Sequence, residues 1–245
     1  MSEKSITLTV VYNNIPHNQR LTTAWGMACL VEGAGKTVLF DTGGDGRILL
    51  ENMKVLGKDP GAVNVVVLSH IHADHTGGLE AFLKQKSNVR VFLPDSFPAS
   101  FKKAVADTGA EVVPVRGAQQ IAEDIHTTGQ MGSLLMEQAL VLDTPKGLVV
   151  VTGCSHPGVA NIAARAVQVC PDRDFYLITG GFHLGGQSRA AVEDIIKAFR
   201  KLGIQKVGPS HCTGDHAIEM FREAWGNDFL DLGCGAQVTI SGERE

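Results

Sequence analysis

Residues with ligand chemistry are concentrated in one short segment of the pattern H-x-H-x-D-H, which supplies His70, His72, Asp74 and His75. It follows the apolar, valine-rich run 63–69, which indicates a buried strand. Because alternate residues at a strand end point the same way, His70 and His72 could hold one cation while Asp74 and His75 face a second. Imidazole and carboxylate are ligands of hydrolytic zinc and also suit manganese or iron. We therefore predict one or two divalent metal ions, with zinc favoured, rather than a polar loop with histidines at chance positions.

Two further histidines complete the predicted ligand set. His156 comes after the expected strand 148–152, and we expect it to be the third protein ligand of the first cation, with a position left open for water. His211 follows the segment 206–210, and we expect it to join the second cation. The predicted metal ligands are thus His70, His72, Asp74, His75, His156 and His211.

The H-x-H-x-D-H segment resembles the signature of the metallo-β-lactamase superfamily. Later motifs narrow the resemblance to the branch named after the dihydropterin phosphate synthase of methanopterin biosynthesis. These motifs are Gly-Cys-Ser-His at 153–156, Gly-Gly-Phe-His-Leu at 180–184 and His-Cys-Thr-Gly at 211–214, together with Thr-Thr-Gly at 127–129 and Glu-Gln-Ala-Leu at 137–140. The resemblance implies an α/β fold of the αββα sandwich type, in which two mixed β-sheets pack face to face with helices on the outer faces. It also implies a one- or two-metal site along one edge.

The resemblance gives Asp41 a supporting role. Asp41 lies in the motif Leu-Phe-Asp-Thr-Gly, where the expected strand 36–40 ends. Its carboxylate could accept the second ring N–H of a ligand histidine and so fix the orientation of the imidazole. Taken by itself, an aspartate before glycine is more simply explained as a turn cap, and the family motif is what favours the supporting role.

One position departs from the family pattern. In two-metal members the residue after such a strand is commonly an aspartate that bridges both cations, and Gly181 occupies that place here. What replaces the bridge is therefore open. His183, two residues further on, could be a substitute ligand, a proton donor or a substrate contact. Cys154 and Cys212 each lie within two residues of a predicted ligand, and we favour small buried residues beside the site over thiol ligands.

The composition indicates one globular domain over residues 1–245. The chain is 44% hydrophobic and 20% charged, and no Pro/Ser-rich linker or repeat divides it. Apolar patterns predict strands and helices in the β-α-β order of an α/β fold. The expected strands lie at 6–12, 26–32, 36–40, 63–69, 89–93, 111–115, 138–142, 148–152, 175–178 and 238–240, and the expected helices at 47–56, 97–106, 159–169 and 187–202, with others beginning at 79 and near 216.

Charge and targeting signals exclude several protein classes. A formal net charge of −4 without a Lys/Arg-rich run argues against a nucleic-acid partner. The segment 1–4 lacks a signal-peptide pattern, and no apolar run is long enough to span a bilayer. Five dispersed cysteines, an odd number, do not suggest a disulfide framework. We predict a cytoplasmic protein that acts on a small molecule without a membrane partner, and the sequence leaves the oligomeric state open.

The expected function is that of a metal-dependent hydrolase, in which metal-activated water attacks a small substrate. Phosphorylated and pterin-like compounds are candidates on the basis of the resemblance. Asp74 would bind the second cation and orient or deprotonate the nucleophile, and His183 would protonate a leaving group or hold a phosphate. Two alternatives remain. One is a non-hydrolytic metalloprotein, such as a metal-dependent synthase or transferase or an iron redox or sensor protein, and the other is a structural domain with an inert site.

Overall fold

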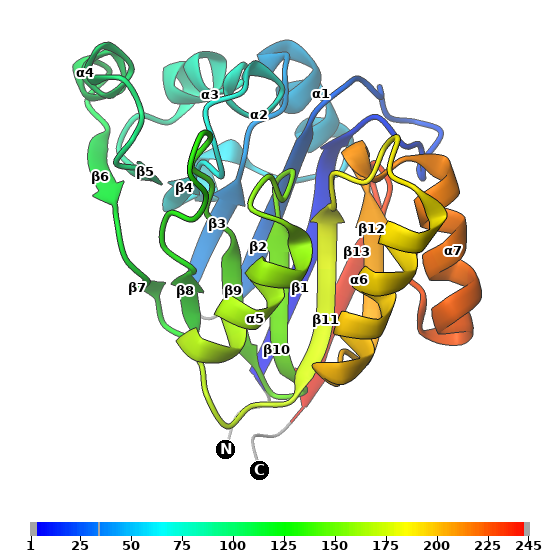
Figure 1. The fold of residues 1–245 in the computed structure, drawn as a ribbon. Helices are drawn as coiled ribbons and strands as arrows, with labels where there is room; N and C mark the ends of the chain where they lie inside the picture. Colours follow the sequence, from blue (N-terminus) through cyan, green and yellow to red (C-terminus); the bar gives the residue numbers. More distant parts are fainter. Residues whose placement is uncertain (1–3, 34, 243–245) are drawn as a thin grey trace.

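The computed structural model of the protein describes residues 4–33 and 35–242. Residues 1–3, part of the segment in which no signal peptide is expected, lie outside these ranges. The strands form two mixed sheets (Figure 1). The seven-stranded sheet contains, in spatial order, β13 (Gln237–Gly242), β1 (Lys4–Asn13), β2 (Met27–Gly33), β3 (Lys36–Phe40), β4 (Val65–Val67), β5 (Arg90–Pro94) and β6 (Glu111–Val115). The six-stranded sheet contains β12 (Lys206–Ser210), β11 (Phe175–Gly181), β10 (Gly147–Thr152), β9 (Leu140–Thr144), β8 (Ile125–Thr127) and β7 (Gln119–Ala122).

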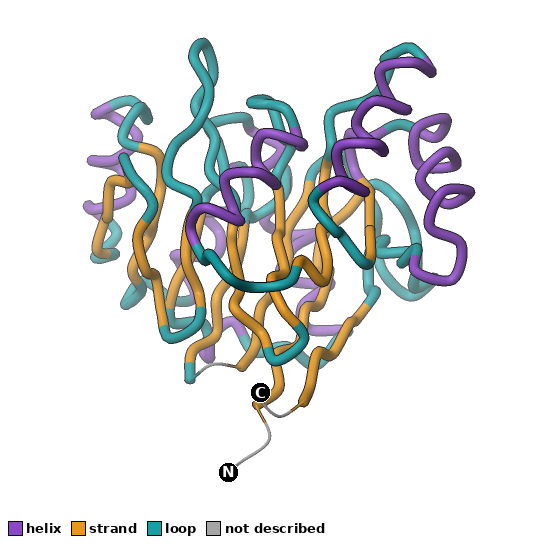
Figure 2. Tube along the Cα trace, turned by 60° about the horizontal axis from the view of Figure 1, so that its bottom comes forward, coloured by secondary structure: helices purple, strands orange, loops and turns teal. Residues whose placement is uncertain are grey.

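Helices cover the outer face of each sheet, and the strands lie between them (Figure 2). The first sheet is accompanied by α1 (Gly46–Val55), the short α2 (Ala73–Thr76), α3 (Leu79–Gln85) and α4 (Ala99–Asp107). The second sheet is covered by α5 (Val159–Val169), α6 (Arg189–Lys201) and α7 (Asp215–Trp225). Short 3-10 turns are η1 (Pro60–Ala62), η2 (His211–Thr213) and η3 (Gly226–Asp228). The predicted αββα sandwich is confirmed. Within the described residues, no helix has the length and apolar character needed to cross a membrane.

Three buried apolar layers hold the sandwich together. Between the two sheets lie alternate side chains of the central strands, among them Val38, Phe40 and Val67. The intervening residues Leu39 and Val66 point to the other face of the same sheet and pack in the layer that includes α1 and α3. A third layer joins the second sheet to α5, α6 and α7. Both faces of β3 and β4 are therefore covered, which explains why these strands are apolar without alternation.

Parallel strands from both sheets lead into the candidate site. β3 and β4 are parallel neighbours, and Asp41 directly follows the first while the segment 69–75 follows the second. In the second sheet β10, β11 and β12 are parallel neighbours too. The segments after their carboxyl ends contain His156, His183 and His211 respectively. Because the crevice outside the carboxyl ends of parallel strands is a common place for ligands, this arrangement favours a site at one edge of the sandwich.

Some element boundaries differ from the sequence-based expectation. The expected strand 63–69 is shortened to the three residues of β4, because Val63 ends the 3-10 turn η1 and the Ser69 N–H donates to the Asp41 carboxylate instead of to a neighbouring strand. The segment 119–134, in which no strand or helix is expected from the sequence, contains the hairpin of β7 and β8. β7 begins with two exposed glutamines, which give no apolar alternation from which a strand could be predicted. Helix α5, in contrast, has the expected bounds.

Replacing Phe40 by alanine tests the layer between the sheets. The ring is fully buried, and removal of a buried phenylalanine side chain costs about 3–5 kcal/mol through lost burial and the cavity left behind. We expect the free energy of unfolding, measured by urea denaturation, to fall by this amount. Leu134→Ala, at a fully exposed side chain, is the control and should change it by less than about 0.5 kcal/mol. An equally small change for Phe40→Ala would contradict the observed packing.

Candidate metal centre

Three histidines contributed by both sheets form a first cluster. His70 and His72 lie in the segment after β4, and His156 lies in the loop after β10. The ring centroids are 4.7 Å apart for His70 and His72, 4.6 Å apart for His70 and His156, and 4.9 Å apart for His72 and His156. The three residues expected at the first cation are therefore neighbours, although 84 positions separate His72 from His156 in the sequence (156 − 72).

The buried ring of His70 has one nitrogen that faces the cluster without a partner. Its Nδ1 lies 2.8 Å from Ser69 Oγ, and that hydroxyl donates to Asp41 Oδ2 at 2.7 Å. Because the hydroxyl proton is used in that hydrogen bond, His70 Nδ1 must donate to Ser69 Oγ, and Nε2 carries the lone pair. Nε2 has no hydrogen-bond partner among residues 4–33 and 35–242. Burial, together with the nearby His75, lowers the pKa of His70 to about 2, so the ring is a neutral imidazole, the form that binds metals.

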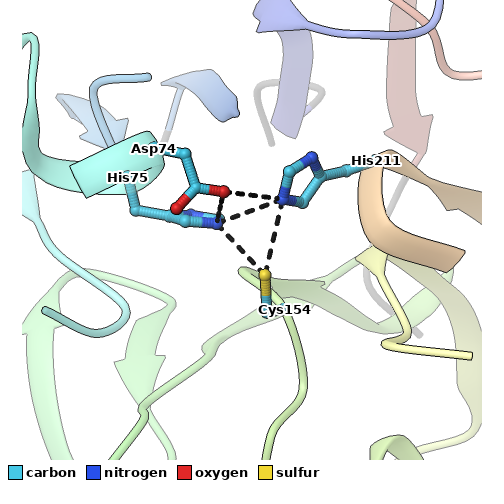
Figure 3. Close-up of side chains that lie close together, drawn as sticks. All are labelled: Asp74, His75, Cys154 and His211. Carbon is cyan, nitrogen blue, oxygen red and sulfur yellow. Dashed lines mark hydrogen bonds and ion pairs between the residues drawn. The ribbon is translucent and has the colours of Figure 1, made fainter. Parts of the chain in front are cut away.

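Asp74, His75, Cys154 and His211 form a second cluster (Figure 3). His75 Nε2 is 3.2 Å from His211 Nε2, and Asp74 Oδ2 is 3.5 Å from the first of these atoms and 3.4 Å from the second. The Cys154 sulfur lies 3.2 Å from His75 Nε2 and 3.4 Å from His211 Nε2. Ligand atoms that surround zinc tetrahedrally at about 2.0–2.3 Å lie about 3.3–3.6 Å from one another. The spacing of the four side chains therefore fits a tetrahedral metal ion.

The tautomers of the second cluster also favour a cation. His75 Nδ1 lies 2.7 Å from Asp41 Oδ2, and His211 Nδ1 lies 2.8 Å from Asn14 Oδ1. Donation from Asn14 Nδ2 to the His211 carbonyl at 3.2 Å fixes the orientation of the amide. Both oxygens accept only, so each neutral imidazole keeps its lone pair on Nε2, and two such lone pairs 3.2 Å apart repel unless a cation lies between them.

When no metal is bound, a proton on His75 can relieve part of the repulsion between these lone pairs. Burial would lower the pKa of His75, but the charge and hydrogen bond of Asp41 outweigh burial and raise it. A single proton on His75 Nε2 can satisfy only one of the three facing acceptors, namely Asp74, Cys154 or His211. A metal ion would contact all of them and would release that proton on binding.

Asp41 supports both clusters. Its side chain is fully buried, and its Oδ1 accepts from the Ser69 N–H at 2.7 Å. Its Oδ2 accepts from Ser69 Oγ and from His75 Nδ1, each at 2.7 Å. Burial raises the pKa of Asp41, and the contacts with His75 and Ser69 partly offset that rise. The supporting role expected for Asp41 agrees with this geometry, which orients His75 directly and His70 through Ser69.

Glu137 has a similar role, which was not predicted from the sequence, where this residue is notable only as part of the motif Glu-Gln-Ala-Leu at 137–140. Its Oε1 accepts from the N–H groups of Cys154 at 2.9 Å and Ser155 at 2.8 Å. Its Oε2 accepts from the N–H and from the ring Nδ1 of His156, both at 2.8 Å. Burial would raise the pKa of Glu137, but the hydrogen bond from His156 and the other donors lower it to about 2. A carboxylate directly before an apolar strand was the available signal.

Backbone strain occurs in the same loops. Asp41, Ser155, His183 and His211 have φ angles of 58°, 68°, 53° and 52°. They are four of the six non-glycine residues with positive φ in the described part of the chain. Each such conformation costs about 1–3 kcal/mol and persists only where the surrounding contacts fix it. The surrounding contacts therefore hold these four residues in strained conformations that fix where their side chains lie.

His183 and Cys212 lie beside the two clusters, next to Cys154. The exposed ring of His183 has its centroid 4.5 Å from that of His156. Cys154, His183 and Cys212 also form a group whose ligand atoms lie within 4.8 Å of one another. Cys154 is buried, as expected, but its sulfur also faces the ligand atoms of the second cluster. The six predicted ligands, Asp41 and His183 are thus brought together at one edge of the sandwich.

A sequence model of the metallo-beta-lactamase superfamily matches residues 26–159, slightly more than half of the chain. The chain belongs to this superfamily. A protein from Methanocaldococcus jannaschii named 7,8-dihydropterin-6-methyl-4-(beta-D-ribofuranosyl)-aminobenzene-5'-phosphate synthase is 29% identical, over 89% of this chain and 91% of its own length. The resemblance to the superfamily and to its methanopterin-pathway branch is therefore confirmed.

Solved structures of the metallo-β-lactamase superfamily have the same fold. A crystal structure described as a metal-dependent hydrolase of the beta-lactamase superfamily matches with a TM-score of 0.80 at 27% identity, over 97% of this chain and all of its own (100%). The metallo-beta-lactamase fold protein YhfI from Bacillus subtilis matches with a TM-score of 0.72 at 14% identity, over 96% of this chain and 99% of its own, and shows the fold alone.

Replacing Glu137 by glutamine tests the buried carboxylate under the His156 loop. Glutamine would point an NH2 group at N–H donors, and we expect a loss of about 1–3 kcal/mol in the free energy of unfolding near neutral pH. The folded pKa of Glu137, about 2, lies below its unfolded value of about 4.3. Its ionisation therefore stabilises the fold fully above about pH 4.3, and this contribution is lost as the pH falls toward about 2.

Urea denaturation of both metal-free proteins at several pH values measures this effect. The difference between wild type and Glu137→Gln should be constant above about pH 5 and shrink below about pH 4. Metal-free protein is used so that metal release at low pH does not contribute. A difference that stays the same as the pH falls from about 7 to about 3 would show that the charge of Glu137 does not stabilise the fold.

Proposed function

We propose that the chain is a metal-dependent hydrolase that binds two divalent ions, with zinc favoured over manganese or iron. The observation that carries the proposal is the buried Nε2 of His70, which has no hydrogen-bond partner within the described ranges and carries a lone pair. A buried acceptor of this kind is costly unless a hydrogen-bond donor or a cation contacts it, and the neighbouring imidazoles favour a cation. The proposed ligands are His70, His72 and His156 at the first position and Asp74, His75 and His211 at the second.

The side chains of the site would divide the hydrolytic reaction among them. When bound, the divalent ions would lower the pKa of water from about 15.7 toward 7 and stabilise charge on a substrate oxygen. Asp74 would orient the attacking water by accepting its hydrogen bond. Burial alone would raise the pKa of Asp74, but its close contacts with His211 and His75 hold that pKa well below its usual range, so the carboxylate is ionised. His183, exposed beside His156, would protonate the leaving group or hold a phosphate.

The surroundings of the site favour a small substrate with a flat ring. Trp25 is 59% exposed, and its ring centroid lies 4.9 Å from that of His211. An exposed indole offers its face to a planar ring such as a pterin. On another side, the exposed Leu134 and His156 line a common cavity. The name of the Methanocaldococcus jannaschii relative includes both a dihydropterin and a phosphate, which supports phosphorylated and pterin-like compounds as the first substrates to test.

A metal-dependent synthase or transferase is the second candidate. It is favoured by that relative, which is named a synthase and is 29% identical over 89% of this chain. The same metal ligands would serve, but the group released from the substrate would pass to an acceptor other than water. Reaction in heavy-oxygen water distinguishes the two functions. Hydrolysis places a solvent oxygen in one product, whereas transfer to another acceptor does not.

A comparison of wild type with His70→Ala tests the proposed metal dependence. Both proteins are loaded with zinc, manganese or iron and assayed on phosphodiesters, lactones, thioesters and pterin phosphates. We expect wild type to bind about two equivalents of metal and to turn over at least one of these classes. His70→Ala should lose metal at the first position and reduce turnover by more than about 100-fold, beyond the 10–100-fold typical of residues that only orient a ligand.

His216→Ala is the matched control for this experiment. His216 is exposed in the first turn of α7, so its removal should leave both metal content and turnover at the wild-type level. Less than about one equivalent of metal in the wild-type protein, or turnover that a chelator does not change, would contradict the proposal.

Trp25→Leu tests the proposed contact with a flat ring. Loss of an aromatic stacking contact of about 0.5–1.5 kcal/mol corresponds to a rise in KM of about 2- to 12-fold. Because the contact is remote from the bond that reacts, kcat should stay within about twofold of wild type. Trp25→Phe keeps an aromatic face and should retain most of the affinity. Equal KM values for all three proteins on a pterin phosphate would exclude this contact.

A further inference from the structure

The sulfur of Cys154 is common to both clusters of ligand atoms. It lies within 4.8 Å of the ligand atoms of Asp74, His75 and His211, and within the same distance of those of His70 and His156. Among the ligand groups found in the described residues, Cys154 is the member that they share. Its side chain is only 4% exposed, and Figure 3 shows the sulfur pointing toward the two histidines and Asp74.

A neutral thiol does not satisfy the atoms that surround it. His75 Nε2 at 3.2 Å and His211 Nε2 at 3.4 Å are both lone-pair nitrogens in the neutral rings, because their Nδ1 atoms donate to Asp41 and Asn14. A thiol has one proton and can donate to only one of them. The unpartnered Nε2 of His70 belongs to the group that Cys154 shares with His156. The three nitrogen lone pairs and the sulfur therefore surround a space in which a cation could be bound by all of them.

The loop that carries Cys154 is held firmly in place. Glu137 accepts from the N–H groups of Cys154, Ser155 and His156 in succession, at 2.9, 2.8 and 2.8 Å. Ser155 has a φ of 68°, and its hydroxyl donates to the Gly181 carbonyl at 2.6 Å. This strained turn sets the direction of the sulfur and of the His156 ring at the same time. The same carboxylate therefore positions a sulfur and an imidazole nitrogen for one site.

Residue 181 does not supply a ligand between the clusters. Gly181 has no side chain, and a Cβ built there would lie 2.4 Å from the Gly153 carbonyl oxygen and 2.7 Å from Cys212 Sγ. Both distances are much shorter than a van der Waals contact. The backbone of the Cys154 loop and the thiol of Cys212 therefore occupy the space that the Cβ of an aspartate would need. A protein ligand shared by both positions would then come from another segment, and the Cys154 loop lies next to residue 181.

We propose that the Cys154 sulfur bridges the two metal positions as a thiolate, in the place of the aspartate that residue 181 cannot provide. The proposal rests on the proposed function in one respect, namely that both positions hold a divalent ion. On binding, the thiol proton passes to solvent and the sulfur forms a bond to each ion, with zinc–sulfur distances of about 2.3 Å. Cys154 is then a metal ligand rather than a small buried residue beside the site.

Cobalt substitution tests the thiolate bond without an enzymatic assay. The full-length protein is freed of metal, loaded with Co²⁺, and examined for the near-ultraviolet charge-transfer absorption of a sulfur–cobalt bond. We expect this band in wild type, its loss in Cys154→Ser, and its retention in Cys212→Ser, the matched control from the adjacent thiol. Cobalt content, measured in parallel, should fall by up to about one equivalent in Cys154→Ser. Circular dichroism of the metal-free variants checks that they fold.

Each alternative outcome has a definite meaning. About two equivalents of cobalt without the band would overturn the bridging thiolate but leave the metal-dependent function standing. Absence of bound cobalt would overturn both. A band that survives in Cys154→Ser and disappears in Cys212→Ser would assign the sulfur ligand to Cys212 instead.

Zinc X-ray absorption of the wild-type protein separates a bridging sulfur from a terminal sulfur ligand. With two zinc ions bound, a bridging sulfur gives about one sulfur neighbour per zinc at about 2.3 Å. A sulfur bound to one ion only gives about half a neighbour per zinc. We expect the first value, and the same value in Cys212→Ser, whereas half a neighbour or none would contradict the bridge.

Discussion

The buried carboxylate of Asp41 is the contact on which the site depends most. It receives two hydrogen bonds from Ser69 and one from His75, all at 2.7 Å. Through the Ser69 hydroxyl it also sets the proton on His70. A carboxylate this deeply buried is tolerated only with such a set of donors, because burial of an unpaired charge is costly. One side chain at the end of β3 therefore ends β4 early, orients one histidine of each cluster and directs their lone pairs toward the same space.

Glu137 performs the corresponding task from the second sheet. It binds three successive backbone N–H groups and the ring of His156. Asp41 and Glu137 thus lie behind the imidazoles, where their negative charge raises the basicity of the ligand nitrogens. The carboxylates of Asp41, Glu137 and Asp74 carry three negative charges, and a Cys154 thiolate would add a fourth. Together they would balance the four positive charges of two divalent ions. Charge balance of this kind reduces the cost of holding both ions in a largely buried site.

The candidate metal centre and the side chains that we propose to contact the substrate lie in different parts of the fold. The ligands follow parallel strands whose ends are fixed by the sheets, and the family relatives have the same architecture over nearly the whole chain. Trp25 and Leu134, in contrast, lie in connecting segments and expose apolar surface beside the ligands. Such segments can change without disturbing the sandwich.

The sequence by itself determined the parts of the protein that depend on local pattern. The H-x-H-x-D-H segment, the apolar strands on either side of the core and the helix α5 were predicted from residue types and their spacing, because burial imposes that spacing on the chain. His156 and His211 were predicted because each would complete the ligands of a cation, and the family motif then added Asp41 as a supporting residue. The polar hairpin of β7 and β8 was missed, because its strands carry no apolar alternation that could reveal them.

Only the tertiary structure decided how distant side chains combine. Glu137 is an ordinary carboxylate in the sequence, and its four hydrogen bonds appear only when β9 and the loop after β10 are folded together. Cys154 likewise resembles a small buried residue until its sulfur is found 3.2 Å from His75 and 3.4 Å from His211. The physical reason is that hydrogen bonds and metal ligation act over a few ångströms in space, and a one-dimensional pattern does not encode which loops come within that distance.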